Sequence, residues 1–149
     1  MSPLLQPRSI NRELARVAIE RAVAVSVERN CITCIAVLDP AGHLVSYDRM
    51  DGAPHQSAQL AQDKAFSVSG NGKATHEFWE MIRDEPWLVH GVGKVEGLVV
   101  LGGGVPIYYQ DELIGAIGVS GRSNMAEDRA IAEAAVAAVL ERLQQTVGN

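Results

Sequence analysis

The sequence predicts an α+β domain, and three observations support this class. Residues 33–50 and 98–120 hold apolar, strand-like runs separated by turn residues, so both ranges predict antiparallel strands joined by tight turns. Apolar residues recur at helical spacing near both ends of the chain, at 9–29 and 124–145. The length of 149 residues fits one domain, which we expect to span residues 1–149. One antiparallel sheet covered by terminal helices is the predicted architecture.

The first half of the chain predicts a helix, a hairpin and a second helix. The helix at 9–29 has an apolar face and charged residues elsewhere. Strands are predicted at Thr33–Asp39 and His43–Met50, because residues 39–42 read Asp-Pro-Ala-Gly, which is typical of a type I turn. The range Gln56–Ser69 predicts a helix with a stripe of alanines, which would let its axis approach a neighbour closely.

A short helix and a loop are predicted next. Thr75 can N-cap a helix over 76–85, and Pro86 stops it. The glycine-containing range Trp87–Lys94 is predicted as a loop.

Three further strands and the last helix complete the predicted order. The strands are expected at Leu98–Leu101, Pro106–Tyr109 and Leu113–Ser120, and the last two form a hairpin. Asn124 and Glu127 stand three residues apart ahead of a long apolar pattern. This spacing resembles a capping box, with Asn124 as the cap of the last helix.

Composition and charge narrow the function classes. Apolar residues make up 47% of the chain and charged residues 21%, which is an ordinary globular mixture. The net charge of −5, without a basic run, argues against nucleic acid as the main partner. No apolar run approaches the roughly 20 residues that a membrane helix needs, so we expect no membrane partner. The N-terminal residues lack the basic start and apolar core of a signal peptide, so we expect a cytoplasmic protein.

The sequence predicts no metal site. Cys31 and Cys34 form a C-x-x-C, but on a strand residues i and i+3 point to opposite faces, so we expect two buried free thiols. No histidine pair has the spacing of metal ligands. The histidines are His43, His55, His76 and His90.

The corner after the second strand, residues 49–54, is the first candidate site. Its Arg49 either grips a ligand carboxylate with paired hydrogen bonds or forms an Arg–Asp pair, with Asp51, that fixes the corner. His55 borders this corner. Histidine titrates near neutral pH, so His55 is a candidate acid or base, and the alternative is an ordinary surface residue.

Lys64 and the glycine-rich stretch extend the candidate site. Lys64 lies on the alanine-rich helix, where it either holds an anion or is paired with Asp63 or a partner chain. The run Gly102–Gly104 either presents backbone amides to a ligand carboxylate or oxyanion, or forms a bulge or a close subunit contact. Gly115 and Gly118 face opposite sides of the last strand, so at least one is expected to serve packing.

Four motifs in order connect the chain to a known family. They are RMDGAP at 49–54, Asp-Lys-Ala at 63–65, GGGVPI at 102–107, and GAIGVSG at 115–121 with the acidic helix start after it. The chain thereby resembles the GlcG/HbpS family, also called the haem-degrading domain family, which is related to the C-terminal domain of PduO. The resemblance runs from about Ile10 to Val139. It implies a profilin-like or PAS-like fold with a five-stranded antiparallel sheet, and homo-oligomers. The residue patterns above place two short helices between the second and third strands.

The resemblance also implies a ligand. Members of the family are associated with haem or corrinoid binding, and some with small-acid or aromatic catabolism. We therefore predict that the chain binds haem as a cofactor, or a related small anionic molecule, near Arg49. Arg49, His55 and Lys64 are the expected binding side chains, with His55 as a haem axial ligand. The glycines expected beside them are Gly102, Gly103 and Gly104. Cobalamin adenosylation is not expected, because the chain lacks the adenosyltransferase domain of PduO.

Two other function classes stay open on the sequence. The first is an enzyme that deaminates, tautomerises or hydrates a small unsaturated carboxylate, such as a muconate-type intermediate of aromatic or glycolate-type catabolism. In it, Arg49 would clamp the carboxylate, the glycine amides would stabilise an oxyanion, and Asp51 or His55 would act as acid or base. The second is a structural or accessory oligomer without a ligand of its own.

Overall fold

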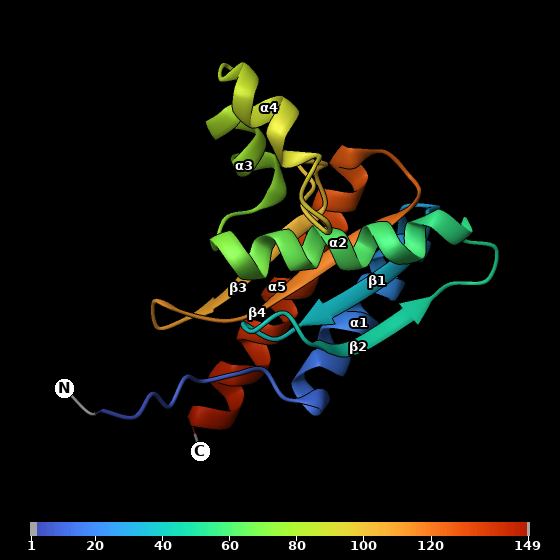
Figure 1. Cartoon of the computed structure of the whole chain (residues 1–149). Helices are drawn as coiled ribbons and strands as arrows, with labels where there is room; N and C mark the ends of the chain where they lie inside the picture. The colour runs from blue at the N-terminus through green and yellow to red at the C-terminus, as the bar shows by residue number, and fades with distance from the viewer. Residues whose placement is uncertain (1–2, 149) are drawn as a thin grey trace.

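One antiparallel sheet between two layers of helices forms the structure, a computed structural model that describes residues 3–148 (Figure 1). This arrangement confirms the predicted α+β class. The elements are α1 (Arg12–Glu28), β1 (Ile32–Leu38), β2 (Leu44–Arg49), α2 (His55–Asn71), α3 (Thr75–Ile82), α4 (Pro86–Val92), β3 (Gly104–Tyr109), β4 (Glu112–Arg122) and α5 (Met125–Val147).

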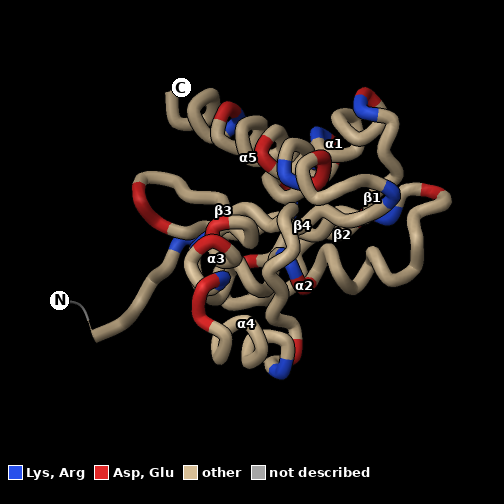
Figure 2. The backbone as a smooth tube through the Cα atoms, turned by 90° about the horizontal axis from the view of Figure 1, so that it is seen from above, with Lys and Arg blue, Asp and Glu red and all other residues tan. Residues whose placement is uncertain are grey.

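The sheet has the strand order β2-β1-β4-β3, and all neighbouring strands are antiparallel. Helices α1 and α5 cover one face, whereas α2 and the α3–α4 arm lie on the other side (Figure 2). Side chains of β1 alternate between the two layers: Ile35 and Val37 join the core under α1 and α5, and Cys34 and Ala36 join the core under α2. Among the described residues no helix is both long and apolar enough to cross a membrane.

The two cysteines behave as predicted. Both are free and buried. Cys31 packs into the core under α1 and α5, whereas Cys34 packs into the core under α2. The sheet therefore lies between the two sulfur atoms, and they act as small apolar groups.

Helix α2 packs very closely on the sheet, and glycine makes this possible. Ala61 and Ala65 face the sheet, fully buried. A Cβ atom on Gly118 would lie 1.9 Å from the carbonyl oxygen of Ala61. On the other face, a Cβ atom on Gly115 would lie 2.8 Å from a methyl group of Ile10. Both glycines therefore serve packing, on opposite sides of β4, as their spacing predicted.

The sheet has four strands, so the predicted five-stranded sheet is wrong in strand number. The missing strand is Leu98–Leu101, which runs as irregular chain. Its backbone groups are held by α2 instead, because the N–H of Val99 donates to the Ser67 hydroxyl at 2.9 Å. The same hydroxyl oxygen lies 3.0 Å from the carbonyl oxygen of Gly97. A helix side chain thus replaces the strand partner that the apolar pattern implied.

Three helices rather than two lie between β2 and β3. The predicted loop Trp87–Lys94 contains most of α4, whose first residue is Pro86. Proline suits this position because the first N–H of a helix has no partner in any case. Thr75 is the first residue of α3 rather than its cap. The Thr75 hydroxyl instead accepts the N–H of Gly104 at 3.0 Å, so the residue joins α3 to β3.

Several local signals are confirmed by the geometry. The Asn124 side chain accepts the N–H of Glu127 at 2.9 Å and caps α5. The turn between β1 and β2 closes through the N–H of Gly42, which donates to the carbonyl oxygen of Asp39 at 3.0 Å.

The close approach of α2 predicts a large effect of Gly118→Ala. The added methyl group would overlap the α2 backbone, so the free energy of unfolding should fall by about 3 kcal/mol. Urea denaturation followed by circular dichroism measures this loss. Gly70→Ala is the matched control, because Gly70 lies in α2 and its Cβ position is empty within 4 Å. Its unfolding free energy should stay equal or rise by up to about 1 kcal/mol. Equal effects of the two substitutions would contradict this account.

Candidate functional site

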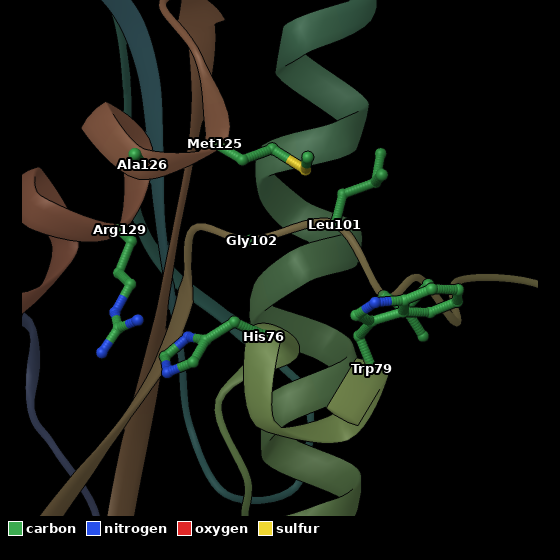
Figure 3. Close-up of a pocket in the computed structure, with 8 residues that line it drawn as sticks. His76, Trp79, Leu101, Gly102, Met125, Ala126 and Arg129 are labelled. Carbon is green, nitrogen blue, oxygen red and sulfur yellow. The ribbon is translucent and has the colours of Figure 1, made fainter. Parts of the chain in front are cut away.

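A cavity of about 500 Å³ lies between α3, the loop before β3 and the first turn of α5 (Figure 3). We call it the α3–α5 pocket. Its volume lies within the range of about 300–1,000 Å³ that is usual for small-molecule sites. Its lining residues come from three segments: His76 and Trp79 of α3, residues 100–102 of the loop, and Met125, Ala126 and Arg129 of α5.

Large apolar side chains form most of the pocket wall. Trp79, Leu101 and Met125 each leave more than a third of their surface exposed, at 38%, 41% and 55%. They come from three different segments of the chain and gather on one cavity. Clustered apolar surface of this kind is typical of a binding site, whereas single exposed apolar residues need no explanation.

His76 carries an unsatisfied polar atom at this pocket. Its Nδ1 atom is shielded from solvent and has no hydrogen-bond partner among the described residues. Such a group costs about 1–3 kcal/mol of stability. The other ring nitrogen, Nε2, lies 4.0 Å from Oε1 of Glu77, which is beyond hydrogen-bond distance.

Arg129 is the charged side chain of the pocket. Its Nε atom donates to Oε1 of Glu133, one helical turn away, at 2.7 Å. Its two terminal nitrogens have no partner among the described residues, and the side chain is about half exposed. In the view of Figure 3, Arg129 and His76 stand on one side of Gly102, and Trp79 and Leu101 on the other.

Behind the pocket lies a buried ion pair that joins α2 to α5. The Nζ atom of Lys64 donates to Oδ2 of Asp128 at 3.0 Å and to the carbonyl oxygen of Val119 at 2.8 Å. The hydroxyl of Ser123 donates to the other carboxylate oxygen of Asp128. Burial lowers the pKa of Lys64 and raises the pKa of Asp128, and the partner's opposite charge partly offsets each shift. The geometry therefore places Lys64 in a structural pair, with Asp128 rather than with Asp63.

The three consecutive glycines divide their roles. Gly102 lines the α3–α5 pocket. Gly103 has φ 121° and packs on the ion pair, since a Cβ atom there would lie 2.8 Å from Cβ of Asp128. Gly104 lies against α2 and its N–H is bonded to the Thr75 hydroxyl, so this amide is not free to bind an oxyanion. Gly103 and Gly104 therefore let the backbone pack closely against other parts of the protein rather than against a ligand.

The structure does not bring Arg49 to the glycine run. Arg49 pairs with Cys34 on β1, and β1 and β4 separate it from β3 at the opposite edge of the sheet. Three strand spacings amount to about 14 Å. The Arg49 guanidinium donates to the carbonyl oxygen of Ala53 at 2.8 Å and thereby fixes the corner. Asp51 and His55 are exposed beside it, and the roles predicted for these residues remain predictions.

The sequence pattern does not single out the pocket residues, although local signals exist. His76 and Trp79 are spaced i,i+3 on α3, and Met125 and Arg129 are spaced i,i+4 on α5, so each pair shares one helix face. The residue spacing within each helix does not show that these two helix faces line one cavity, because α4, β3 and β4 separate α3 from α5 in the sequence. No group of three or more His, Cys, Asp or Glu side chains within residues 3–148 is placed to hold a metal ion.

The fold and the pocket have the form of an α+β protein that binds a small ligand. The chain belongs to the HbpS-like family, because the family model for haem degrading protein HbpS-like matches residues 10–137. This confirms the resemblance that the four motifs indicated.

Three curated relatives support the assignment. GlcG of Escherichia coli is 30% identical over 111 residues, which cover 74% of this chain and 81% of GlcG. The corrinoid adenosyltransferase PduO of Salmonella typhimurium is 32% identical over 128 residues, which cover 85% of this chain but 37% of PduO. An uncharacterized 15.0 kDa protein of Citrobacter freundii is 28% identical over 138 residues, which cover 91% of this chain and 96% of that protein.

Solved structures show the same fold. HbpS of Streptomyces reticuli superposes with a TM-score of 0.83 at 28% identity, covering 92% of this chain and 91% of that structure. A PduOC–haem complex superposes with a TM-score of 0.78 at 25% identity, covering 87% of this chain and 94% of that structure. A protein of this fold and family has therefore been crystallised with haem.

The buried pair predicts a pH-dependent loss of stability in Lys64→Met. The substitution leaves the Asp128 carboxylate buried without its cation, so the free energy of unfolding should fall by about 3–5 kcal/mol at pH 7. In the wild type, burial raises the pKa of Asp128 and the Lys64 charge lowers it. Without Lys64 the folded-state pKa of Asp128 rises further, so the variant binds a proton there on folding and loses the stability this gives as pH rises through that pKa. The difference from the wild type should therefore be smaller at pH 4 than at pH 7. Urea denaturation at both pH values measures it.

The double variant Lys64→Met/Asp128→Leu is the control for that experiment. It removes both charges and fills their space with apolar groups, which is often neutral for stability. We expect it to recover most of the loss at pH 7. A double variant as unstable as the single one would show that steric misfit, not the unpaired charge, causes the loss.

Proposed function

We propose that this protein binds haem, or a related flat tetrapyrrole, in the α3–α5 pocket. One observation carries the proposal: apolar side chains from three chain segments meet there around a histidine with an unpartnered nitrogen. Membership of the HbpS-like family and the haem complex of PduOC support the choice of ligand.

The residues present fit a haem-type group. Among the lining residues, the His76 imidazole and the Met125 thioether can donate an electron pair to iron, and both residue types serve as haem ligands in proteins. Trp79 and Leu101 offer apolar surface that would shield one side of a flat ring from water. Bound haem would supply a redox-active iron centre, and the protein would supply the position and the apolar surroundings.

Titration with haemin, followed in the Soret region, tests the proposal. We expect the Soret absorbance of haemin to change in a saturable way when the wild-type protein binds it. Trp79→Ala should weaken binding about tenfold, because loss of a buried aromatic contact of about 1.4 kcal/mol corresponds to that factor. Tyr108→Ala is the matched control. Tyr108 is 41% exposed, close to the 38% of Trp79, and does not line the pocket, so haemin affinity should stay within twofold of the wild type.

The corner at Arg49 remains a second possible location, and the same titration separates the two. If the ligand binds in the α3–α5 pocket, Arg49→Ala and His55→Ala should leave haemin affinity unchanged. Weaker binding in these two variants, with Trp79→Ala unchanged, would place the ligand at the corner. Absence of any saturable change in the wild type would refute haem binding altogether.

We also propose that the chain forms homo-oligomers through the α3–α4 arm. Large apolar side chains are exposed on and near this arm, which projects from the body of the molecule (Figure 1). They are Met81, Trp87, Leu88 and Val95. Sedimentation velocity should show a species larger than a monomer, and Trp87→Glu should shift it towards the monomer. A wild type that sediments as a monomer at all concentrations would contradict this proposal.

A further inference from the structure

We infer that the α3–α5 pocket holds its ligand by a carboxylate group and that Arg129 determines this specificity. The inference rests on the proposed function. It adds the chemistry that the ligand must carry and the end of the pocket at which that chemistry binds.

Arg129 offers the right donors at the right place. Among the lining residues it alone carries a full formal charge at neutral pH. Glu133 holds its Nε atom at 2.7 Å and so fixes the direction of the side chain. The two terminal nitrogens have no partner among the described residues, and such N–H groups match the two oxygens of a carboxylate.

The other polar groups at the Arg129 end of the pocket are also hydrogen-bond donors, or can be donors in one tautomer. The Nδ1 atom of His76 has no partner within residues 3–148. Met125 and Ala126 are the first two residues of α5, a 23-residue helix, and their backbone N–H groups have no intrahelical acceptor. The side chain of Asn124 caps the N–H of Glu127 and leaves those two uncapped. The amino end of a long helix adds partial positive charge, so an anionic group is favoured here.

Within residues 3–148, Glu133 is the carboxylate bonded to Arg129, and it uses the Nε atom and leaves the two terminal nitrogens open. None of the lining residues is acidic. Glu133 is engaged with Arg129, and Glu77 lies 4.0 Å from the far nitrogen of His76. The opposite end is apolar, with Trp79 and Leu101. The ligand class is therefore a flat apolar skeleton that carries a carboxylate, and the propionate groups of a tetrapyrrole meet this description.

Comparison of a porphyrin diacid with its diester tests the inference. We would titrate the protein with protoporphyrin IX and with its dimethyl ester, both metal-free, so that iron ligation does not contribute. The wild type should bind the acid at least tenfold more tightly than the ester. In Arg129→Met, acid affinity should fall about tenfold and ester affinity should stay unchanged, so the two become nearly equal. Arg142→Met, on the same helix and outside the pocket, should keep the wild-type preference.

Glu133→Gln separates the charge of Arg129 from the integrity of the helix. It keeps the guanidinium and removes its anionic partner, so the preference for the acid should be retained or increased. Circular dichroism confirms that each variant is folded. Equal binding of acid and ester by the wild type, or an unchanged preference in Arg129→Met, would overturn this inference and leave porphyrin binding intact. Absence of binding by both porphyrins would overturn the proposed function and this inference together.

Discussion

The buried ion pair between Lys64 and Asp128 is the interaction on which the arrangement of the site depends. It joins the middle of α2 to the first turn of α5, and Lys64 also holds the backbone of β4 at Val119. A buried pair of this kind adds little net stability, because desolvation of both charges offsets their attraction. Its geometric requirement is strict, however, since either charge left alone would be costly. The pair thus fixes where α5 begins relative to the sheet.

Glycine is the second condition for this arrangement. Gly103 lets the loop before β3 lie directly on the ion pair, and Gly118 lets α2 lie directly on β4. Because both approaches need the space of a missing Cβ atom, the loop and the helix have little freedom to shift. Gly102, the neighbour of Gly103 in this loop, lines the α3–α5 pocket. The close packing of Gly103 on the ion pair therefore also fixes the position of this part of the pocket wall. The glycine-rich stretch therefore mainly allows close packing between the loop, α2 and β4. It contributes one residue, Gly102, to the lining of the pocket.

The proposed site lies at the junction of these parts. The ion pair positions the first turn of α5 with Met125 and Arg129, and Thr75 anchors the start of α3, with His76 next to it, to Gly104. Two helices that are distant in sequence thereby present a histidine, an arginine and apolar groups to one cavity. An apolar wall with a few polar groups at one end is the common form of a small-molecule site, and it suits the haem-type ligand that the family suggests.

The sequence by itself determined the α+β class, the two hairpins, the Asn124 cap of α5 and the family, because turn chemistry, capping and apolar periodicity are local. It correctly predicted that Gly115 and Gly118 face opposite sides of β4 and that at least one of them serves packing; in the structure both do. The sequence pattern wrongly predicted a strand at Leu98–Leu101. In the structure the N–H of Val99 donates to the Ser67 hydroxyl instead of to a neighbouring strand. Only the tertiary structure paired Lys64 with Asp128, separated Arg49 from the glycine run and brought α3 to α5. These contacts join residues far apart in the chain, and no local pattern specifies such a meeting.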